Sequence, residues 1–391
     1  LRQKLSFGKS ASLRNGLVIV QFVIAVFLIS STLLIRNQIE FMSKKNMGFD
    51  SEEIMTIYAS SHDFTNQEEG IVQLNTFKNQ LKQKSYIKDI ALSRAVPTSW
   101  TRSFTFVRPD DWNGDPLRMR FTYVDANFFE TYGISVKSGR GFMSDSEGDQ
   151  RNSVMLNEAA MEAFEFETAD DNVIKIGENR INVVGVVEDF HFESLESKVE
   201  PTLIFHRTAN HAVHQFITCK IEMSDLQTKM EEIEKMWNGL GSTNTFNYSF
   251  MDDRIKRMYE SEERFLGLIS MFSIISIIIA CLGLYGLTLF IIQKRRKELS
   301  IRKVLGAEVT GLLRLIFKDF AIWIGLAFII GVPLVIYFIN DWMQSFYYRT
   351  GVSWLSFGFT FLLMAVLISL TVGYQSVKAA NVNPVKYLKD E

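Results

Sequence analysis

The sequence is poor in the residues that cross-link folds or bind metal ions. Its 391 residues include only two cysteines and five histidines. Cys219 lies in a polar stretch and Cys281 in an apolar run, so we expect no disulfide between them. Neither cysteine has the spacing of a metal site.

Recognisable catalytic motifs are missing as well. The sequence has no Gly-x-Ser-x-Gly elbow and no His-Glu-x-x-His pair. Gly8-Lys9-Ser10 resembles the end of a phosphate-binding loop, but Gln3 stands where such a loop needs glycine, and no strand precedes it. The sequence therefore shows no machinery for nucleotide hydrolysis.

The histidines do not form a convincing site. All five lie in one polar stretch: His62, His191, His206, His211 and His214. His211 and His214 have helical metal-ligand spacing, but no cysteine or nearby carboxylate completes the set. The run from Glu188 to His191 contains acid and base groups, yet it ends an apolar strand, which favours a turn or an interface over acid–base chemistry.

Charge of either sign is absent from four long runs, residues 16–35, 265–292, 320–339 and 354–374. Each is long enough for a helix to cross the hydrocarbon core of a bilayer, which takes about 20 residues. Gln21 is the one strongly polar side chain of the first run, and Pro333 is expected to kink the third. The sequence therefore predicts a membrane protein with four transmembrane helices.

The basic residues predict the orientation of these helices. Residues 1–15 carry four basic residues and no acid, and residues 293–319 carry eight basic residues against three acids. Residues 36–264 carry 26 basic and 38 acidic residues. We expect segments 1–15, 293–319 and 375–391 in the cytoplasm, with 36–264 and the short 340–353 loop outside.

The 36–264 segment has the pattern of a mixed α/β domain. Helical periodicity covers residues 71–86, and strand patterns cover 89–96, 117–124, 180–190 and 215–221. Ser224 and Gln227 predict a capping box for a helix that reaches Trp237 and stops at Gly239. Residues 36–47 and 252–264 are expected to form helical stalks at the two ends of the domain.

Two further segments predict contacts. The small residues Ala280, Gly283 and Gly286 in the second run favour close helix packing, although such residues are common in membrane helices generally. In the loop after that run, a helix would place Ile301, Val304 and Leu305 on one stripe and end at Gly306. This stripe is consistent with docking to a cytoplasmic partner or with simple anchoring at the membrane.

Several motifs resemble the FtsX/MacB-type ABC permeases. The loop sequence from Lys294 to Ala307, KRRKELSIRKVLGA, resembles the signature of that family. The stretch from Tyr123 to Phe129 through Gly139-Arg140, the strand from Asn182 to His191, and the ending Asn383-Pro-Val-Lys386 resemble its periplasmic core and C-terminus. The resemblance covers nearly the whole chain.

The resemblance implies a bacterial inner-membrane permease subunit with a large periplasmic domain and no cofactor of its own. ATP would be bound by a separate cytoplasmic ABC ATPase. Other implied partners are a second permease half, in the same chain or as a homodimer, and a periplasmic adaptor or lipoprotein, besides membrane lipid and without nucleic acid. The chain also looks like the second half of a duplicated eight-span protein. The ATPase-coupling candidates are Glu298, Ile301, Arg302, Lys303, Val304, Leu305 and Gly306.

Two other functions remain open at this point. A ligand-sensing receptor without ATP coupling would share the topology and lack an ATPase partner. A membrane-anchored enzyme acting outside would need a clustered catalytic or metal site. The sequence does not choose a substrate.

Overall fold

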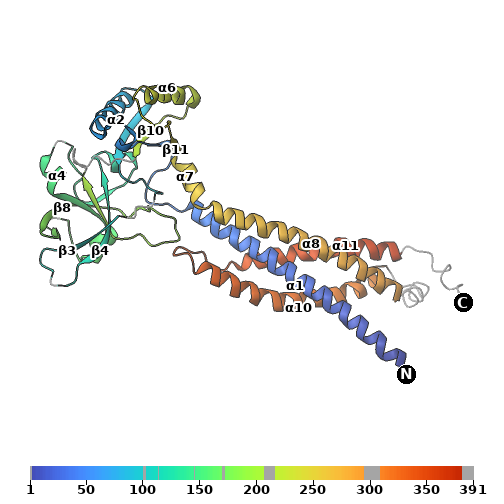
Figure 1. Cartoon of the computed structure of the whole chain (residues 1–391). Coiled ribbons are helices and arrows are strands. Elements are labelled where there is room, and N and C mark those ends of the chain that lie inside the picture. The colour runs from blue at the N-terminus through green and yellow to red at the C-terminus, as the bar shows by residue number, and fades with distance from the viewer. Residues whose placement is uncertain are drawn as a thin grey trace. The chain divides into compact units, whose positions relative to one another are not determined.

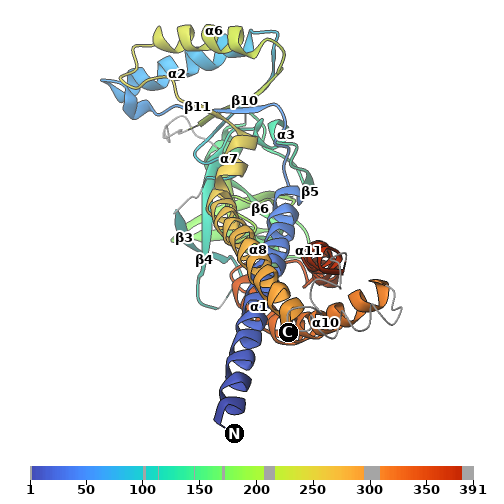
Figure 2. The ribbon, with the colours of Figure 1, turned by 90° about the vertical axis from the view of Figure 1, so that its right-hand side faces the viewer.

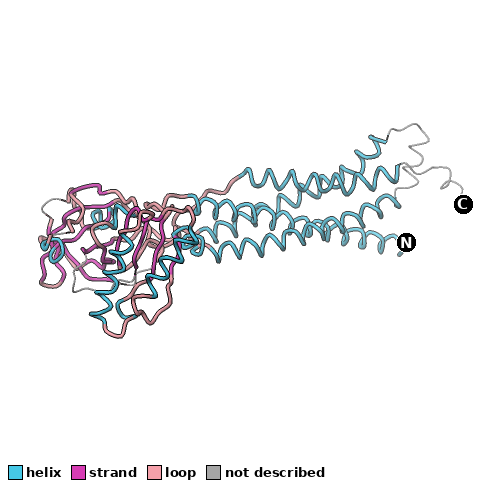
Figure 3. The backbone as a smooth tube through the Cα atoms, turned by 90° about the horizontal axis from the view of Figure 1, so that it is seen from above, coloured by secondary structure: helices cyan, strands magenta, loops and turns pink. Residues whose placement is uncertain are grey.

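The computed structural model describes residues 2–99, 103–112, 114–144, 146–169, 172–206, 216–294 and 309–380. The chain divides into two compact units. One is a helical unit of Leu1–Met42 with Ser261–Glu391, and the other is an α/β domain of Ser43–Glu260. The described strands all belong to the α/β domain (Figure 3).

Long helices make up the described part of the helical unit (Figure 1). They are α1 (Arg2–Lys44), α8 (Glu260–Lys294), α10 (Val309–Met343) and α11 (Trp354–Ala380). Four stretches within them are long and apolar enough to cross a membrane: Asn15–Lys44, Glu260–Lys294, Phe320–Met343 and Trp354–Gln375. The prediction of four transmembrane helices beside a mixed α/β domain is thereby confirmed. Helix α10 continues through Pro333.

Helix α1 lies at the centre of the helical unit. Half of its apolar window is buried, against 17% for α8. Phe22 of α1, Leu284 of α8, Phe320 of α10 and Ile368 of α11 belong to one apolar core. All four helices therefore contribute side chains to one core, which includes the buried face of α1.

Hydroxyl and amide groups join α1 to the other helices. The Ser30 hydroxyl donates to Thr360 on α11 at 3.0 Å, and the Thr32 and Ser273 hydroxyls lie 2.9 Å apart between α1 and α8. The Gln38 amide donates to the Tyr348 carbonyl at 2.9 Å and accepts from the Thr350 backbone N–H at 2.7 Å. Such bonds are a usual means of fixing helix contacts in an apolar medium.

The first half of the α/β domain is a sheet covered by two helices. Its strand order is β11-β1-β10-β2, and all of these neighbours are antiparallel. Helices α2 and α6 lie together over the sheet (Figure 2) and share with it a core that contains Phe77, Cys219 and Trp237. The bounds are β1 Ile54–Tyr58, β2 Ile87–Ser93, β10 Phe216–Ile221, β11 Tyr248–Phe250, α2 Gln67–Lys82 and α6 Leu226–Asn238.

The second half closes into a six-stranded barrel. Its six strands form a closed ring through the pairs β3–β7, β7–β8, β8–β6, β6–β9, β9–β4 and β4–β3. Strands β4 and β9 run parallel in this ring. The ring strands are β3 Phe104–Pro109, β4 Leu117–Val124, β6 Ser153–Asn157, β7 Val173–Ile176, β8 Asn179–Val187 and β9 Thr202–His206. Ser93 of β2 pairs with Val124 of β4 and so joins the barrel to the first half.

Short elements complete the domain. Strand β5 adds to β8 outside the ring. The remaining bounds are η1 Ser61–Asp63, α3 Phe128–Thr131, β5 Val136–Gly139, α4 Glu147–Asn152, α5 Glu158–Ala163 and α7 Met251–Met258.

Three local predictions need correction. The helix expected over 71–86 is α2, which begins four residues earlier because the Asn66 side chain accepts the Glu68 backbone N–H. The capping box at Ser224 does not form; Asp225 precedes α6 in a left-handed conformation, and the Ser224 hydroxyl accepts from Lys229 instead. The second stalk is not one helix, because α7 ends at Met258 and α8 begins at Glu260.

Candidate functional site

The two chain ends of the α/β domain meet in one apolar core. Met47 and Phe49 from the first end and Met251 from the second are buried there with Phe190 and Phe192. We call this region the end junction: residues 45–50, 189–195 and 251–259. Any displacement of either end acts on the same packed side chains, which transmit strain because protein interiors are close-packed.

The first end lies against the turn that follows β8. The His191 backbone N–H donates to the Met47 carbonyl at 2.9 Å. Gly48 has φ +85°, and a Cβ atom there would lie 2.8 Å from the Phe190 Cα atom. Both the left-handed backbone and the close approach require glycine at this position.

Asp189 fixes the same turn to helix α5. Its carboxylate accepts the Ala159 backbone N–H at 3.0 Å, and its own N–H donates to the Glu158 carboxylate at 3.0 Å. Burial raises the pKa of the Asp189 carboxyl above its usual range. The structure therefore places the Glu188–His191 run in a turn that contacts helix α5 and the first end of the domain, which agrees with the turn or interface that the sequence favoured.

His191 is a buried neutral group in this junction. Its side chain is 7% exposed, and burial together with the nearby charge of Lys45 lowers its pKa to about 4. At neutral pH the imidazole is uncharged, so it packs in the junction without needing a counter-ion.

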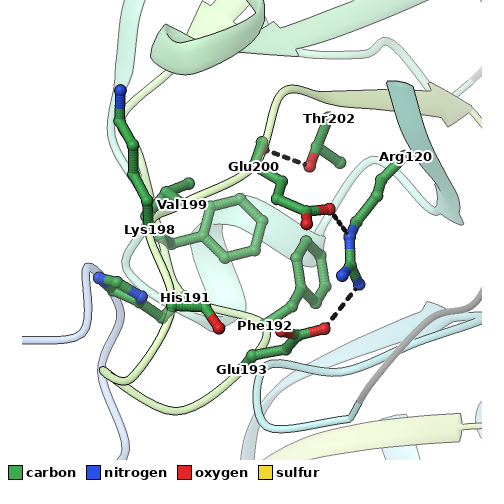
Figure 4. A pocket seen from close by; sticks show the side chains of 10 residues that line it. Arg120, His191, Phe192, Glu193, Lys198, Val199, Glu200 and Thr202 are labelled. Carbon is green, nitrogen blue, oxygen red and sulfur yellow. Dashed lines mark hydrogen bonds and ion pairs between the residues drawn. The ribbon is translucent and has the colours of Figure 1, made fainter. Parts of the chain in front are cut away.

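Arg120 anchors the loop between β8 and β9 (Figure 4). Its guanidinium, on β4, is almost fully buried and pairs with Glu193 at 2.7 Å and with Glu200. The cavity beside this cluster has a volume of about 20 Å³, which is room for roughly one water molecule. The cluster is therefore a structural clamp on the loop and too small for a substrate.

The second end is tied to this same loop. The Leu195 backbone N–H donates to the Tyr259 hydroxyl at 3.1 Å, and Tyr259 is 2% exposed. Arg254 of α7 donates to the Thr98 hydroxyl at 3.0 Å. Residues 189–195 thus bind the first end through His191 and the second through Leu195.

The Gly139-Arg140 pair has a clear structural reason. Gly139 has φ +71° and lies directly against β8, where a side chain would clash with the Val184 carbonyl. Arg140 makes two hydrogen bonds to the buried Asp149, of 2.6 and 2.8 Å. This pairing holds the pKa of Asp149 below its usual range and ties the start of α4 to β5.

The structure describes the predicted helix-packing residues but not the predicted coupling residues. The coupling candidates, Glu298 and Ile301 to Gly306, lie outside the described residues. Ala280 is buried in the helical core, and Gly283 lies so close to Gln21 of α1 that a side chain would clash with its amide. Gly286 is exposed with open space beside it. The packing role of these three residues stays a prediction.

The histidines occupy separate elements. His62 is exposed in η1, His191 follows β8 and His206 ends β9, whereas His211 and His214 lie outside the described residues. No group of three metal-ligating side chains occurs among the residues that the structure describes.

Sequence reasoning missed Tyr259 of the end junction and Arg120, which clamps the loop beside it. Tyr259 stood in a charged stretch that suggested a solvated helix. Arg120 follows Arg118 by two residues on a strand, where charged residues normally face solvent. Gly48 was the one available signal, because a glycine directly after a membrane helix and its extension indicates a sharp backbone turn.

Two family models match this chain. A MacB-like periplasmic core domain matches residues 17–229, and an FtsX-like permease C-terminal matches residues 270–384. The first match covers more than half of the chain. Together with the four apolar helices, the matches identify a multi-pass inner-membrane protein.

Individual relatives are distant. An ABC transporter permease of Methanocaldococcus jannaschii is 23% identical over 291 residues, covering 71% of this chain and 69% of the relative. The macrolide export ATP-binding/permease protein MacB of Bdellovibrio bacteriovorus is 22% identical over 338 residues, covering 81% of this chain and 49% of the relative. The chain thus spans about half the length of that MacB protein.

Among solved structures, the periplasmic region of MacB from Actinobacillus actinomycetemcomitans covers 56% of this chain and 97% of its own length. Its TM-score is 0.39 and its sequence identity 16%. From the two family matches, we conclude that the chain belongs to the FtsX/MacB-type ABC transporter permeases, with a MacB-like periplasmic core domain and an FtsX-like permease C-terminal.

Proposed function

We propose that this chain is the membrane subunit that couples ATP hydrolysis on a cytoplasmic ABC ATPase to movement of its α/β domain outside the membrane. ATP binds to the ATPase, which is a separate partner, and this chain carries out no chemistry. A second permease half, in the same protein or as a second copy, completes the pair that two nucleotide-binding domains would need. A periplasmic adaptor or lipoprotein would receive the movement.

The end junction is the observation that carries this proposal. Residues 189–195 hold the chain at Met47 and again at Tyr259, and Arg120 clamps the following loop to the barrel. A relative displacement of the two ends therefore applies force to residues 189–195 and, through them, to strands β4 and β8. A domain that merely hung from a flexible linker would not have its two ends buried together.

Force would enter through the segment of residues 293–319, which includes the start of α10 and which we propose lies in the cytoplasm. Its apolar residues Ile301, Val304 and Leu305 would fill a groove on the ATPase, and Arg302 and Lys303 would pair with acidic groups around that groove. Gly306 would end the helix. Glu298 would orient the loop through its basic neighbours.

The experiment measures ATP hydrolysis in the complex that co-purifies with a tagged chain. We expect Arg302→Glu combined with Leu305→Asp to release the ATPase or to lower its activity in the complex by about tenfold, equivalent to about 1.4 kcal/mol. Arg349→Glu is the matched control, because Arg349 is exposed in the short 340–353 loop, which we propose lies outside. Unchanged hydrolysis and co-purification in the double variant would contradict the coupling role and favour a receptor without ATP coupling.

A further inference from the structure

The barrel of the α/β domain has an open end. A cavity of about 310 Å³ lies there, and every strand of the ring contributes to its wall: Thr105, Phe121, Ser153, Ile176, Ile181 and Phe205. Away from this cavity, Val107, Met119 and Leu156 of the same strands are buried in an apolar core. The cavity is therefore the mouth of the barrel, which is a usual place for small-ligand sites.

Aromatic rings dominate one wall of this mouth. The ring centroids of Phe121, Tyr123 and Phe205 lie 5.6 to 6.2 Å apart, so the three form a continuous surface. All three rings are half-buried, and all three line the cavity. Gln150 and Arg151 of α4 contribute polar groups. Arg151 is largely exposed, and its ion pair with Glu147 is long, at 3.8 Å.

A second, polar cavity adjoins the mouth. It has a volume of about 430 Å³ and shares Gln150 and His206 with the first. Helix α2 supplies Lys78 and Lys82 to its wall. Lys78 pairs with Asp125 at 2.9 Å, so those two charges balance. Lys82 is exposed and, among the described residues, has no acidic partner, which leaves the second cavity with an excess positive charge.

From this arrangement we infer that the two cavities together bind a small amphiphilic anion. Its ring-bearing apolar part enters the barrel mouth against Phe121, Tyr123 and Phe205. Its acidic group lies beyond Gln150 and His206, near Lys82. Apolar burial supplies most of the affinity, and the cation fixes the orientation, as in most small-molecule sites.

This site does not depend on coupling to an ATPase. Binding is measured on the chain alone, so a failure here leaves the coupling proposal standing, and a failure of coupling leaves this site standing.

The test uses the full chain in nanodiscs of a zwitterionic lipid. The probe is 8-anilino-1-naphthalenesulfonate, which joins aromatic rings to an anion and fluoresces in apolar surroundings. N-phenyl-1-naphthylamine is the uncharged companion probe. Fluorescence above that of empty nanodiscs reports binding to the protein. We expect saturable binding of both probes to the unmodified chain.

Two variants separate the halves of the site. Thr105→Phe fills the mouth and should abolish the binding of both probes, whereas Thr76→Phe on the exposed side of α2 should leave it unchanged. Lys82→Glu should weaken the binding of the anionic probe by about fivefold, as expected for reversing one charge near a surface. It should leave the binding of the uncharged probe unchanged. Lys235→Glu on the exposed side of α6 is its control.

Two competitors then identify the apolar part. 2-Naphthoate and decanoate both carry a carboxylate, and aromatic walls favour the ring. We expect 2-naphthoate to displace the anionic probe at the lower concentration. The assignment of the site is overturned if Thr105→Phe binds the two probes as the unmodified chain does. The placement of the acidic group near Lys82 is overturned if Lys82→Glu has no effect on the anionic probe. Stronger displacement by decanoate would overturn the ring assignment in favour of a lipid acyl chain.

Discussion

At the scale of single residues, buried charge holds the α/β domain together at a few points. Arg120 pairs with Glu193 and Glu200 in the loop between β8 and β9, and Arg140 pairs with Asp149 of α4. The cost of removing one partner exceeds the benefit of the pair, because the remaining charge stays buried without compensation.

Arg120→Ala is therefore expected to destabilise the loop between β8 and β9. Burial already raises the pKa of Glu193, so its carboxylate depends on the guanidinium. We expect a loss of about 3 kcal/mol, seen as faster hydrogen exchange across residues 188–201 of the full chain in detergent. Arg118→Ala is the control, since Arg118 lies on the same strand and is exposed. Equal exchange in the two variants would contradict the clamp.

His191 predicts a pH dependence of the end junction. Its pKa falls from 6.5 to about 4 on folding, so the unfolded segment binds a proton that the folded one does not. The stabilisation is complete above pH 6.5 and is lost as the pH falls from 6.5 to 4. The loss reaches about 2 kcal/mol after allowance for solvent screening.

The measurement compares hydrogen exchange of residues 43–50 at pH 7.5 and pH 5, corrected for the chemical exchange rate. His191→Phe keeps the packing and should remove this part of the pH dependence. Asp189 and Glu193, whose raised pKa values act in the opposite direction, contribute equally to both proteins. The same pH dependence in both proteins would show that His191 is not the responsible group.

At the scale of elements, sequence patterns located most long helices and strands but missed their ends. Strand β4 was predicted to the residue, over 117–124, because its apolar and polar side chains alternate cleanly. The start of α2 was missed because Asn66 caps the helix ahead of the first apolar residue. The break at Tyr259 was missed because the stabilising contact, to Leu195, is distant in sequence.

The barrel could not be derived from the sequence. Its closure depends on a parallel pairing between β4 and β9, which are far apart along the chain. Strands β5 and β7 have four residues each, too short for a reliable alternation. The mouth of the barrel, and with it the proposed ligand site, follows only from that pairing.

Gly283 and Gly286 offer a matched test of packing between α1 and α8. A side chain at Gly283 meets the Gln21 amide, whereas one at Gly286 meets open space. We expect Gly283→Leu to destabilise the helical unit by about 1–3 kcal/mol through overpacking, and Gly286→Leu to have little effect. Thermal unfolding of the two variants in the same detergent is the measurement. A lower midpoint for Gly286→Leu would reverse the assignment.

At the scale of the whole molecule, composition alone predicted the class of fold. Four uncharged runs became four helices able to cross a membrane, and the polar stretch became a separate α/β domain. The end junction was missed because Tyr259 does not stand out in sequence, and Gly48 alone does not show which segments meet there. The coupling candidates, Glu298 and residues 301–306, were by contrast read from their motif and lie outside the described residues.

The orientation of the chain is testable by cysteine labelling in cells. We expect Thr76→Cys in the α/β domain to react with an impermeant maleimide from outside, and Lys303→Cys to react only after the membrane is permeabilised. The background is Cys281→Ala. Cys219 can stay, since it is fully buried and burial raises the pKa of its thiol, which keeps it unreactive. Labelling of Lys303→Cys in intact cells would invert the topology.

Because Met47 and Tyr259 are bound to neighbouring points of one loop, the α/β domain begins and ends at nearly the same place. A domain with adjacent termini can be excised or transplanted without stretching the chain that receives it. We therefore expect residues 43–260 to behave as a portable module, and the four helices to assemble when a short polar linker replaces it.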